Sequence, residues 1–211
     1  MRSNGSPGTT TRTSTSCRLD VADSADTMGA MAPTEAGLTL AEHYAAGQDS
    51  GMRRELVDGV QIVSPYASKR HALAALRLSQ ILSASCPPEF LVFGSPIDID
   101  REPATNLQPD LSVIRAEDLD APATAGRPLL VVEILSPSTR RFDQTLKRPL
   151  YAEMGIPSYW LVDIEAPSVT VLELAADVYV DAAHLKGANR QQIARPFPVE
   201  FAASDLTTLV P

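Results

Sequence analysis

The chain has 211 residues, of which 44% are hydrophobic and 21% are charged, and its formal net charge is -8. This length suits one domain with a tail, and no apolar run approaches the roughly 18 residues that a membrane-spanning helix needs. The acidic balance argues against a protein that coats nucleic acid by charge alone, so an enzyme acting on nucleic acid would need a local basic rim.

The N-terminal segment, residues 1–35, is rich in Ser, Thr, Gly and Ala and has no apolar periodicity. Such a composition is typical of disordered chain, so we expect a disordered extension at 1–35 and a folded domain at 36–211. Met28 and Met31 stand just before the expected domain, which leaves a later translation start open.

Local signals predict two helices and a hairpin in the next part of the chain. Thr39 is a suitable cap for a short helix from Leu40 to Ala46. The strand-like runs 55–57 and 60–63 flank Asp58-Gly59, a strong signal of a β-hairpin. Apolar residues at near-helical spacing predict a helix over 67–85, before Pro87-Pro88.

The rest of the domain alternates between strand and helix patterns. Strands are predicted at 90–93, 97–99, 111–114, 129–135, 159–162, 169–174 and 178–180, with a loop over 117–127. A helix is predicted from Phe142 to Met154, with Gly155 as a natural stop. The strand, helix, strand order over 129–162 implies a crossover and at least one parallel pair, and thus an α/β fold.

The cysteines and histidines exclude several kinds of site. Cys17 and Cys86 have no paired spacing, which argues against a disulfide framework or a zinc ribbon and favours a reducing cytoplasm. His43, His71 and His184 share no ligand spacing, so a histidine-based zinc or iron site is not expected. His71 could approach a catalytic site from its helix, but a lone helix histidine is more often structural or exposed.

Several basic clusters are candidates for a nucleic-acid-binding rim, with an ordinary solvated surface as the alternative. Their members are Arg53, Arg54, Lys69, Arg70, Arg77, Arg140, Arg141, Lys147 and Arg148.

Glu133 is the most informative single residue. It interrupts the otherwise apolar run 129–135, in a segment expected to be covered on both faces. A buried carboxylate requires a cation, a network of donors or a shifted pKa. The alternative is a strand-end glutamate that reaches solvent or an arginine.

Asp110 and Lys147 complete a candidate site. Pro109-Asp110 opens another apolar strand, and two adjacent strands would bring Asp110 and Glu133 together as an oxygen site suited to Mg²⁺. A lysine facing these acids would orient a water and stabilise charge on a phosphate. By spacing alone, however, Pro-Asp is a turn feature, and Asp143 with Lys147, four apart on a helix, is better explained as a surface ion pair.

The ordered set of motifs decides between these readings. It comprises Glu55-Leu56-Val57-Asp58-Gly59, Ser64-Pro65, His71, Pro109-Asp110-Leu111-Ser112-Val113, Val132-Glu133-Ile134-Leu135-Ser136-Pro137-Ser138-Thr139, Asp143, Lys147, Tyr151 and Gly155-Ile156-Pro157-Ser158-Tyr159-Trp160-Leu161-Val162-Asp163. Over roughly residues 38–205 this set resembles the Uma-type endonucleases of the restriction-endonuclease-like PD-(D/E)XK superfamily. The resemblance implies a single α/β domain with a mixed, strongly bent β-sheet flanked by helices, and a site at the rim where the acid-bearing strands diverge.

The resemblance also implies roles for individual residues. Asp110, Glu133 and the carbonyl of Ile134 would hold the metal, and Lys147 would replace the lysine that the superfamily normally has at the position of Leu135. Glu55 matches an acid near the first motif, as an additional ligand or water contact; an exposed hairpin-edge glutamate is its alternative.

Two departures from the family pattern and two packing residues complete the comparison. Pro149 departs from a regular helix, because proline inside a helix costs about 3 kcal/mol, and it either delays the helix or re-aims Lys147. Ser158 replaces a glutamate without an expected catalytic effect. Tyr151 and Trp160 are expected to be packing residues.

The implied function is a Mg²⁺-dependent endonuclease, with Mn²⁺ as a substitute, that hydrolyses nucleic acid, DNA rather than RNA, as a cytoplasmic homodimer without a membrane segment. One alternative is a non-catalytic nucleic-acid- or protein-binding module that keeps the fold, as Pro149 and the acidic net charge favour. A glycosidase using Asp110 and Glu133 as acid and base is a second alternative, but it leaves Lys147 unused and does not suit an aromatic content of 5%.

Overall fold

The computed structural model describes residues 37–47, 52–65, 67–137 and 139–208. All of them belong to the unit Glu35–Pro211. The extension expected at 1–35 lies outside the described residues. Within the described part, none of the helices combines the length and the apolar character that crossing a bilayer requires.

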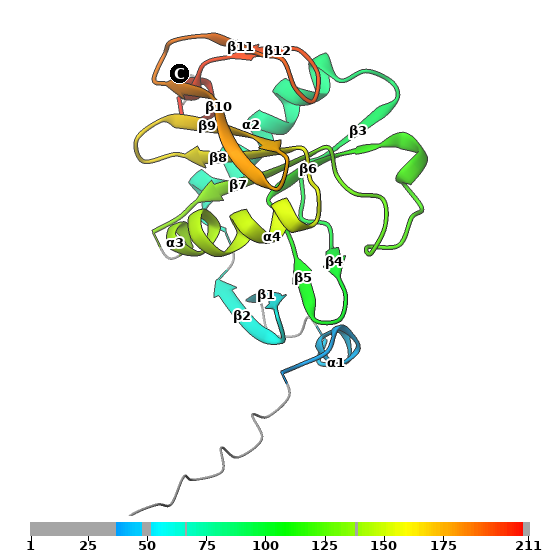
Figure 1. Cartoon of the computed structure of the whole chain (residues 1–211). Coiled ribbons are helices and arrows are strands. Elements are labelled where there is room, and N and C mark those ends of the chain that lie inside the picture. Colours follow the sequence, from blue (N-terminus) through cyan, green and yellow to red (C-terminus); the bar gives the residue numbers. More distant parts are fainter. Residues whose placement is uncertain (1–36, 48–51, 66, 138, 209–211) are drawn as a thin grey trace, which may run out of the picture. The chain divides into compact units, whose positions relative to one another are not determined.

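A six-stranded mixed sheet forms the centre of the domain (Figure 1). Its strands, in spatial order, are β10 (Val178–Lys186), β9 (Ser168–Ala175), β8 (Ser158–Asp163), β7 (Leu130–Leu135), β6 (Leu111–Arg115) and β3 (Phe90–Phe93). The pair β7–β8 is parallel, and every other neighbouring pair is antiparallel. The predicted crossover and the α/β class are therefore confirmed.

Both faces of this sheet are covered, which explains the nearly continuous apolar run of β7. Successive side chains of a strand point to opposite faces, so Val132 and Ile134 join one core cluster while Val131 and Leu135 join another. The helix α2 (Lys69–Ser85) covers the first face through Ala74, Leu78 and Leu82, which are spaced four apart. Glu133 lies between Val132 and Ile134 in the strand, so its side chain points to the opposite face of the sheet, toward the second cluster.

A helical segment over residues 140–153 covers that second face (Figure 1). It consists of α3 (Arg140–Phe142), a π-helical turn (Asp143–Lys147) and α4 (Arg148–Glu153), where a helix was predicted from Phe142 to Met154 with Pro149 either delaying it or re-aiming Lys147. Pro149 accounts for the difference, because it cannot donate to the carbonyl four residues earlier and its ring would clash there. The wider π turn ends at Lys147, and Pro149 lies in the first turn of α4. Lys147 and Asp143 both remain buried.

A second sheet of four strands lies beside the first (Figure 1). Its order is β2 (Val60–Pro65), β1 (Met52–Val57), β5 (Thr105–Leu107) and β4 (Ile99–Arg101). The predicted hairpin is present: Asp58 and Gly59 have φ values of 45° and 83°, as its tight turn requires. The strand predicted at 97–99 overlaps β4 only at Ile99, and β5 was not predicted, because Thr-Asn-Leu carries no apolar alternation.

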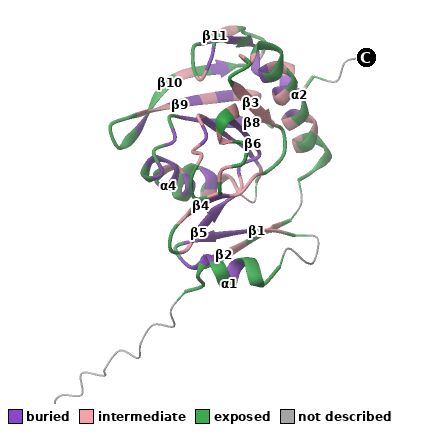
Figure 2. Cartoon of the chain, turned by 90° about the vertical axis from the view of Figure 1, so that its right-hand side faces the viewer, coloured by how far each residue is buried: buried purple, intermediate pink, exposed green. Residues whose placement is uncertain are grey.

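Short elements complete the domain. Thr39 caps α1 (Leu40–Ala45) in a capping box with Glu42, as the sequence predicts for this position. The strands β11 (Gln191–Ile193) and β12 (Val199–Phe201) form a two-stranded sheet that was not predicted, followed by a 3-10 turn (Ala203–Leu206). Their apolar residues add to the cluster beneath α2, where Phe201 stacks on Trp160. Figure 2 shows that burial is concentrated in the strands and in the inner faces of the helices.

Candidate active site

The strands β6 and β7 bring Asp110 and Glu133 side by side. Leu111 pairs with Val132, so the antiparallel register places Asp110 opposite Glu133, one position further. The Asp110 carboxylate then accepts the backbone N–H of Ile134 at 2.7 Å. The two side chains are 6% and 2% exposed, so the solvent-reaching alternative for Glu133 is wrong.

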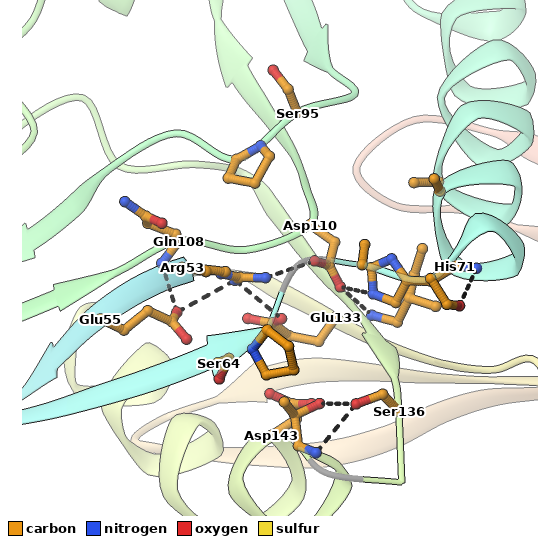
Figure 3. A pocket seen from close by; sticks show the side chains of 18 of the residues that line it. Arg53, Glu55, Ser64, His71, Ser95, Gln108, Asp110, Glu133, Ser136 and Asp143 are labelled. Carbon is orange, nitrogen blue, oxygen red and sulfur yellow. Dashed lines mark hydrogen bonds and ion pairs between the residues drawn. The ribbon is translucent and has the colours of Figure 1, made fainter. Parts of the chain in front are cut away.

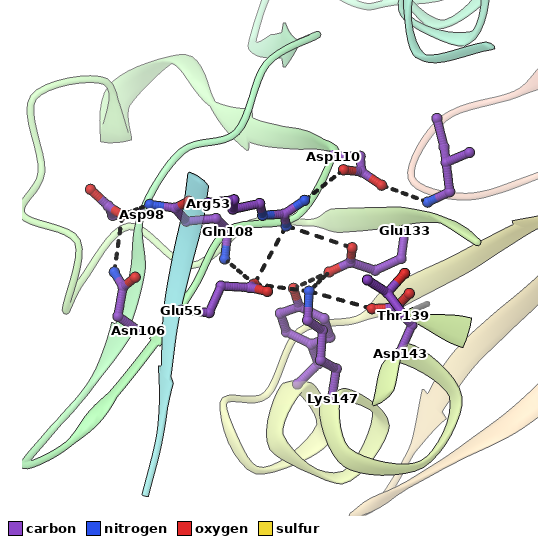
Figure 4. Close-up of polar contacts among 12 residues, drawn as sticks. Arg53, Glu55, Asp98, Asn106, Gln108, Asp110, Glu133, Thr139, Asp143 and Lys147 are labelled. Atoms are coloured by element: carbon purple, nitrogen blue, oxygen red, sulfur yellow. Dashed lines mark hydrogen bonds and ion pairs between the residues drawn. The ribbon is translucent and has the colours of Figure 1, made fainter. Parts of the chain in front are cut away.

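Lys147 reaches these acids from the π-helical turn. Its Nζ lies 2.8 Å from Glu133 Oε1, 2.8 Å from Glu55 Oε1 and 3.5 Å from Asp143 Oδ1. Figure 4 shows the ammonium group between the three carboxylates. Lys147 is 1% exposed, so the surface-pair interpretation of Asp143 and Lys147 is wrong.

Glu55 enters the site from the second sheet. It lies in β1, is buried, and its Oε1 accepts the backbone N–H of Gln108 at 2.8 Å. The alternative of an exposed hairpin-edge glutamate is therefore wrong. The site forms where the two sheets meet the helical segment, and the structure brings Asp110, Glu133, Lys147 and Glu55 together.

Arg53 belongs to the same group, although the sequence analysis placed it among candidates for a basic rim. Its Nη1 lies 2.8 Å from Asp110 Oδ1, and its Nη2 lies 3.4 Å from Glu55 Oε1 and 3.8 Å from Glu133 Oε2. The side chain is only 19% exposed. The missed signal is the strand alternation, which places Arg53 on the same face as Glu55.

Two further side chains contact the acids. His71, at the start of α2, places Nε2 3.1 Å from Asp110 Oδ2, so it is not simply an exposed helix residue. The Tyr151 hydroxyl donates to Glu133 Oε1 at 2.8 Å, so Tyr151 is more than the packing residue that was predicted. Both residues stand in the ordered motif set, but local spacing does not show what they contact, because each contact joins residues far apart in the chain. Trp160, by contrast, is buried in the core as expected.

A cavity of about 600 Å³ opens onto this group. Figure 3 shows Arg53, His71, Asp110 and Glu133 lying together in it. Its other walls come from the hairpin end Ser64-Pro65, the loop 94–96 and the segment that follows β7. The exposed residues Lys69 and Arg70 stand in sequence between the lining residues Ser68 and His71 but do not line the cavity themselves.

Burial dominates the electrostatics of the site. It raises the pKa of Glu133 to about 8, an effect that Asp143 and Asp110 strengthen and that Lys147 and Arg53 oppose. Burial opposes ionisation of Asp110 too, yet hydrogen bonding from His71 and the charge of Arg53 bring its pKa below the ordinary value. Burial works against the charge of Lys147, but Glu133 and Glu55 raise its pKa, so the ammonium group stays charged.

The raised pKa of Glu133 predicts a pH-dependent stability. The carboxyl holds its proton up to pH about 8 when folded, against an ordinary pKa of 4.5. Between these values the folded state binds more protons, so its free energy of unfolding falls as pH rises, by up to about 1.4 kcal/mol per pH unit. Denaturant unfolding of the metal-free protein from pH 5 to 8 measures this slope. Glu133→Gln should flatten it, and an unchanged slope in that variant would assign it to another group.

The donor set fits a divalent cation. Four acids, Glu55, Asp110, Glu133 and Asp143, face two permanent cations, Arg53 and Lys147, so fully ionised carboxylates leave a charge of about -2 in a buried site. The carbonyl of a strand residue points the same way as its N–H, which directs the Ile134 carbonyl toward Asp110.

The described residues contain no group of three or more His, Cys, Asp or Glu side chains placed to hold a metal. The expected ligand set is smaller, with two carboxylates and one carbonyl, which suits an ion that keeps several waters.

The chain is similar to known proteins over most of its length. The model of the Uma2 family, described as a putative restriction endonuclease, matches residues 40–208. The crystal structure of a putative nuclease belonging to DUF820 from Anabaena variabilis superposes with a TM-score of 0.64 at 17% identity, covering 81% of this chain and 97% of that one. None of the curated proteins matches.

Proposed function

The chain belongs to the Uma2 family of putative restriction endonucleases, and from this premise we propose that it is a divalent-metal-dependent endonuclease that hydrolyses phosphodiester bonds. Family and fold support a nuclease-like function. The observation that carries the finer proposal is the convergence of Asp110, Glu133 and Lys147 in one cavity. We take DNA as the preferred substrate, Mg²⁺ as the preferred ion, and a homodimer, whose two sites would cut two strands, as the working assembly.

Asp110, Glu133 and the Ile134 carbonyl would hold the ion. When bound, a divalent cation supplies Lewis acidity and lowers the pKa of a coordinated water. Asp110 is held in place for this by the Ile134 N–H, and Glu133 by the Tyr151 hydroxyl. These fixed contacts mean that little reorganisation is needed at the reacting phosphate.

Lys147 would orient the attacking water and stabilise negative charge on the phosphate. An ammonium group has three N–H donors. Two point to oxygens of Glu55 and Glu133 at 2.8 Å, whereas the third partner, Asp143, is 3.5 Å away. The third donor is therefore the one for which a water or a phosphate oxygen competes most easily, and Glu55 serves to hold Lys147 in position.

The glycosidase alternative finds no support in this geometry. It requires two carboxyl groups that act as acid and base on a sugar, but here Lys147 and Arg53 pair directly with the acids. The non-catalytic alternative makes a different prediction, namely nucleic-acid binding without turnover, and the following experiment distinguishes it.

We expect the protein to nick or linearise supercoiled plasmid in Mg²⁺ or Mn²⁺, to cleave RNA more slowly, and to be inactive in chelator. The reason is that, without the ion, the site has no Lewis acid to lower the pKa of a water that attacks the phosphate. Gel assays of plasmid, single-stranded DNA and RNA measure the result. Binding of Mn²⁺ and DNA without any cleavage would favour the non-catalytic module. Cleavage that persists in chelator would contradict the proposed dependence on a metal ion.

A further inference from the structure

Arg53 contacts the same two carboxylates that the proposed function assigns to the metal. Its guanidinium is 2.8 Å from Asp110 Oδ1 and 3.8 Å from Glu133 Oε2, whereas Lys147 is on the other oxygen of Glu133, Oε1. Figures 3 and 4 show the guanidinium between Glu55, Asp110 and Glu133. Both cations therefore contact Glu55 and Glu133, but of the two only Arg53 forms an ion pair with Asp110.

A guanidinium and a divalent ion cannot share this position. The Asp110 oxygens already accept from Arg53 at 2.8 Å and from the Ile134 N–H at 2.7 Å, with His71 at 3.1 Å. An ion bound to Asp110 and Glu133 would take up lone pairs that Arg53 uses, and the two positive charges would repel each other at short range in a buried site. Lys147 does not face this conflict at Asp110.

The Arg53 side chain can also move away from the acids. It lines the cavity and keeps 19% of its side chain exposed, in contrast to Lys147 at 2%. Its Nε is buried without a hydrogen-bond partner among the described residues, so that nitrogen does not tie the side chain to one position. A long, flexible arginine side chain can move into the cavity while its strand stays in place.

We propose that Arg53 is an internal competitor of the metal ion: it occupies the position beside Asp110 and Glu133 in the metal-free protein, and a divalent ion must displace it to bind. This inference rests on the proposed metal-dependent function and adds to it a residue that sets the metal affinity. The proposal gives the two cations of the site different roles: Lys147 would remain beside the bound ion, whereas Arg53 would move away from it.

The test is calorimetric titration of Mn²⁺ into metal-free Arg53→Gln and the unmodified protein. We expect Arg53→Gln to bind Mn²⁺ at least tenfold more tightly, because both the competing charge and the steric conflict are gone. Mn²⁺ should also raise the melting temperature of the variant more than that of the unmodified protein. Arg54→Gln is the matched control: it removes the same charge from the adjacent strand position, whose side chain points to the other face and donates to the Gly47 carbonyl.

Each outcome has a defined meaning. Unchanged or weaker Mn²⁺ binding in Arg53→Gln overturns the inference, because Arg53 would then support the ligands rather than compete for them. An equal gain of Mn²⁺ affinity in Arg54→Gln would show that the gain comes from the change in net charge alone. That result would also overturn the inference. If Arg53→Gln does not fold, Arg53→Lys replaces it, and its affinity should exceed that of the unmodified protein, since a single ammonium cannot bridge the acids as the guanidinium does.

The unmodified protein itself tests the underlying function separately. Failure of that protein to bind Mn²⁺ while Arg53→Gln binds it would support competition. Failure of both proteins would overturn the proposed metal site and the inference with it. Tight binding by both proteins with equal affinity would leave the proposed function intact and overturn the role of Arg53 alone.

Discussion

Glu133→Gln is expected to reduce metal-dependent cleavage on the order of a thousandfold without unfolding the protein. A ligand that helps to stabilise charge in the transition state contributes several kcal/mol, and about 1.4 kcal/mol corresponds to each tenfold change in rate. Glutamine keeps the shape of the side chain but is a poor metal ligand. Asp110→Asn should have a similar effect, because it removes the neighbouring carboxylate from the same pair.

The fold should survive this substitution for a specific reason. Burial already favours the neutral form of Glu133, whose pKa is raised to about 8, so an uncharged amide suits the site. Lys147 would retain Glu55 at 2.8 Å as a partner. Circular dichroism and denaturant unfolding at pH 7 check the fold.

Single-turnover cleavage of plasmid measures the loss of activity. Glu117→Gln, which makes the same chemical change at an exposed position outside the cavity, is the control and should cleave normally. Unchanged cleavage in Glu133→Gln would remove the proposed mechanism altogether.

Lys147→Met is expected to destabilise the fold by about 3–5 kcal/mol, the usual effect of removing one partner of a buried ion pair. The methionine side chain fills a similar volume, but Glu55 and Glu133 would lose the ammonium that each contacts at 2.8 Å. For a domain of this size, such a change lowers the melting temperature by roughly 10 °C. Differential scanning calorimetry at neutral pH measures it.

The double variant Lys147→Met with Glu133→Gln provides the decisive comparison. With glutamine at position 133, one carboxyl group fewer depends on the missing ammonium, so the double variant should be more stable than Lys147→Met alone. Lys186→Met, at an exposed position in β10, is the control and should stay close to the unmodified protein. Equal stability of Lys147→Met and the unmodified protein would show that the ammonium does not neutralise the buried acids.

Local sequence signals predicted all six strands of the central sheet and missed strands of the two smaller sheets for identifiable reasons. The hairpin at Asp58-Gly59 and the strand pair β7–β8 follow from turn chemistry and from apolar runs interrupted by a helix. The strands β5 and β11 are three residues long and carry polar residues, so their strand conformation depends on pairing with distant segments. Pro149 signalled an irregular helix, but the local pattern did not specify that the irregularity is a π turn.

The apolar run 129–135 was enough to place the carboxylate of Glu133 in a strand covered on both faces, and the ordered motifs pointed to Asp110, Lys147 and Glu55 as its companions. The burial of Asp143 and Lys147, and the contacts of Arg53, His71 and Tyr151 with the acids, became visible only in the folded chain. The physical reason is that periodicity reports which face of its own element a side chain occupies, whereas the partner across that face comes from another element. Where two sheets and a helix meet, burial and charge are set jointly by residues that no local pattern connects.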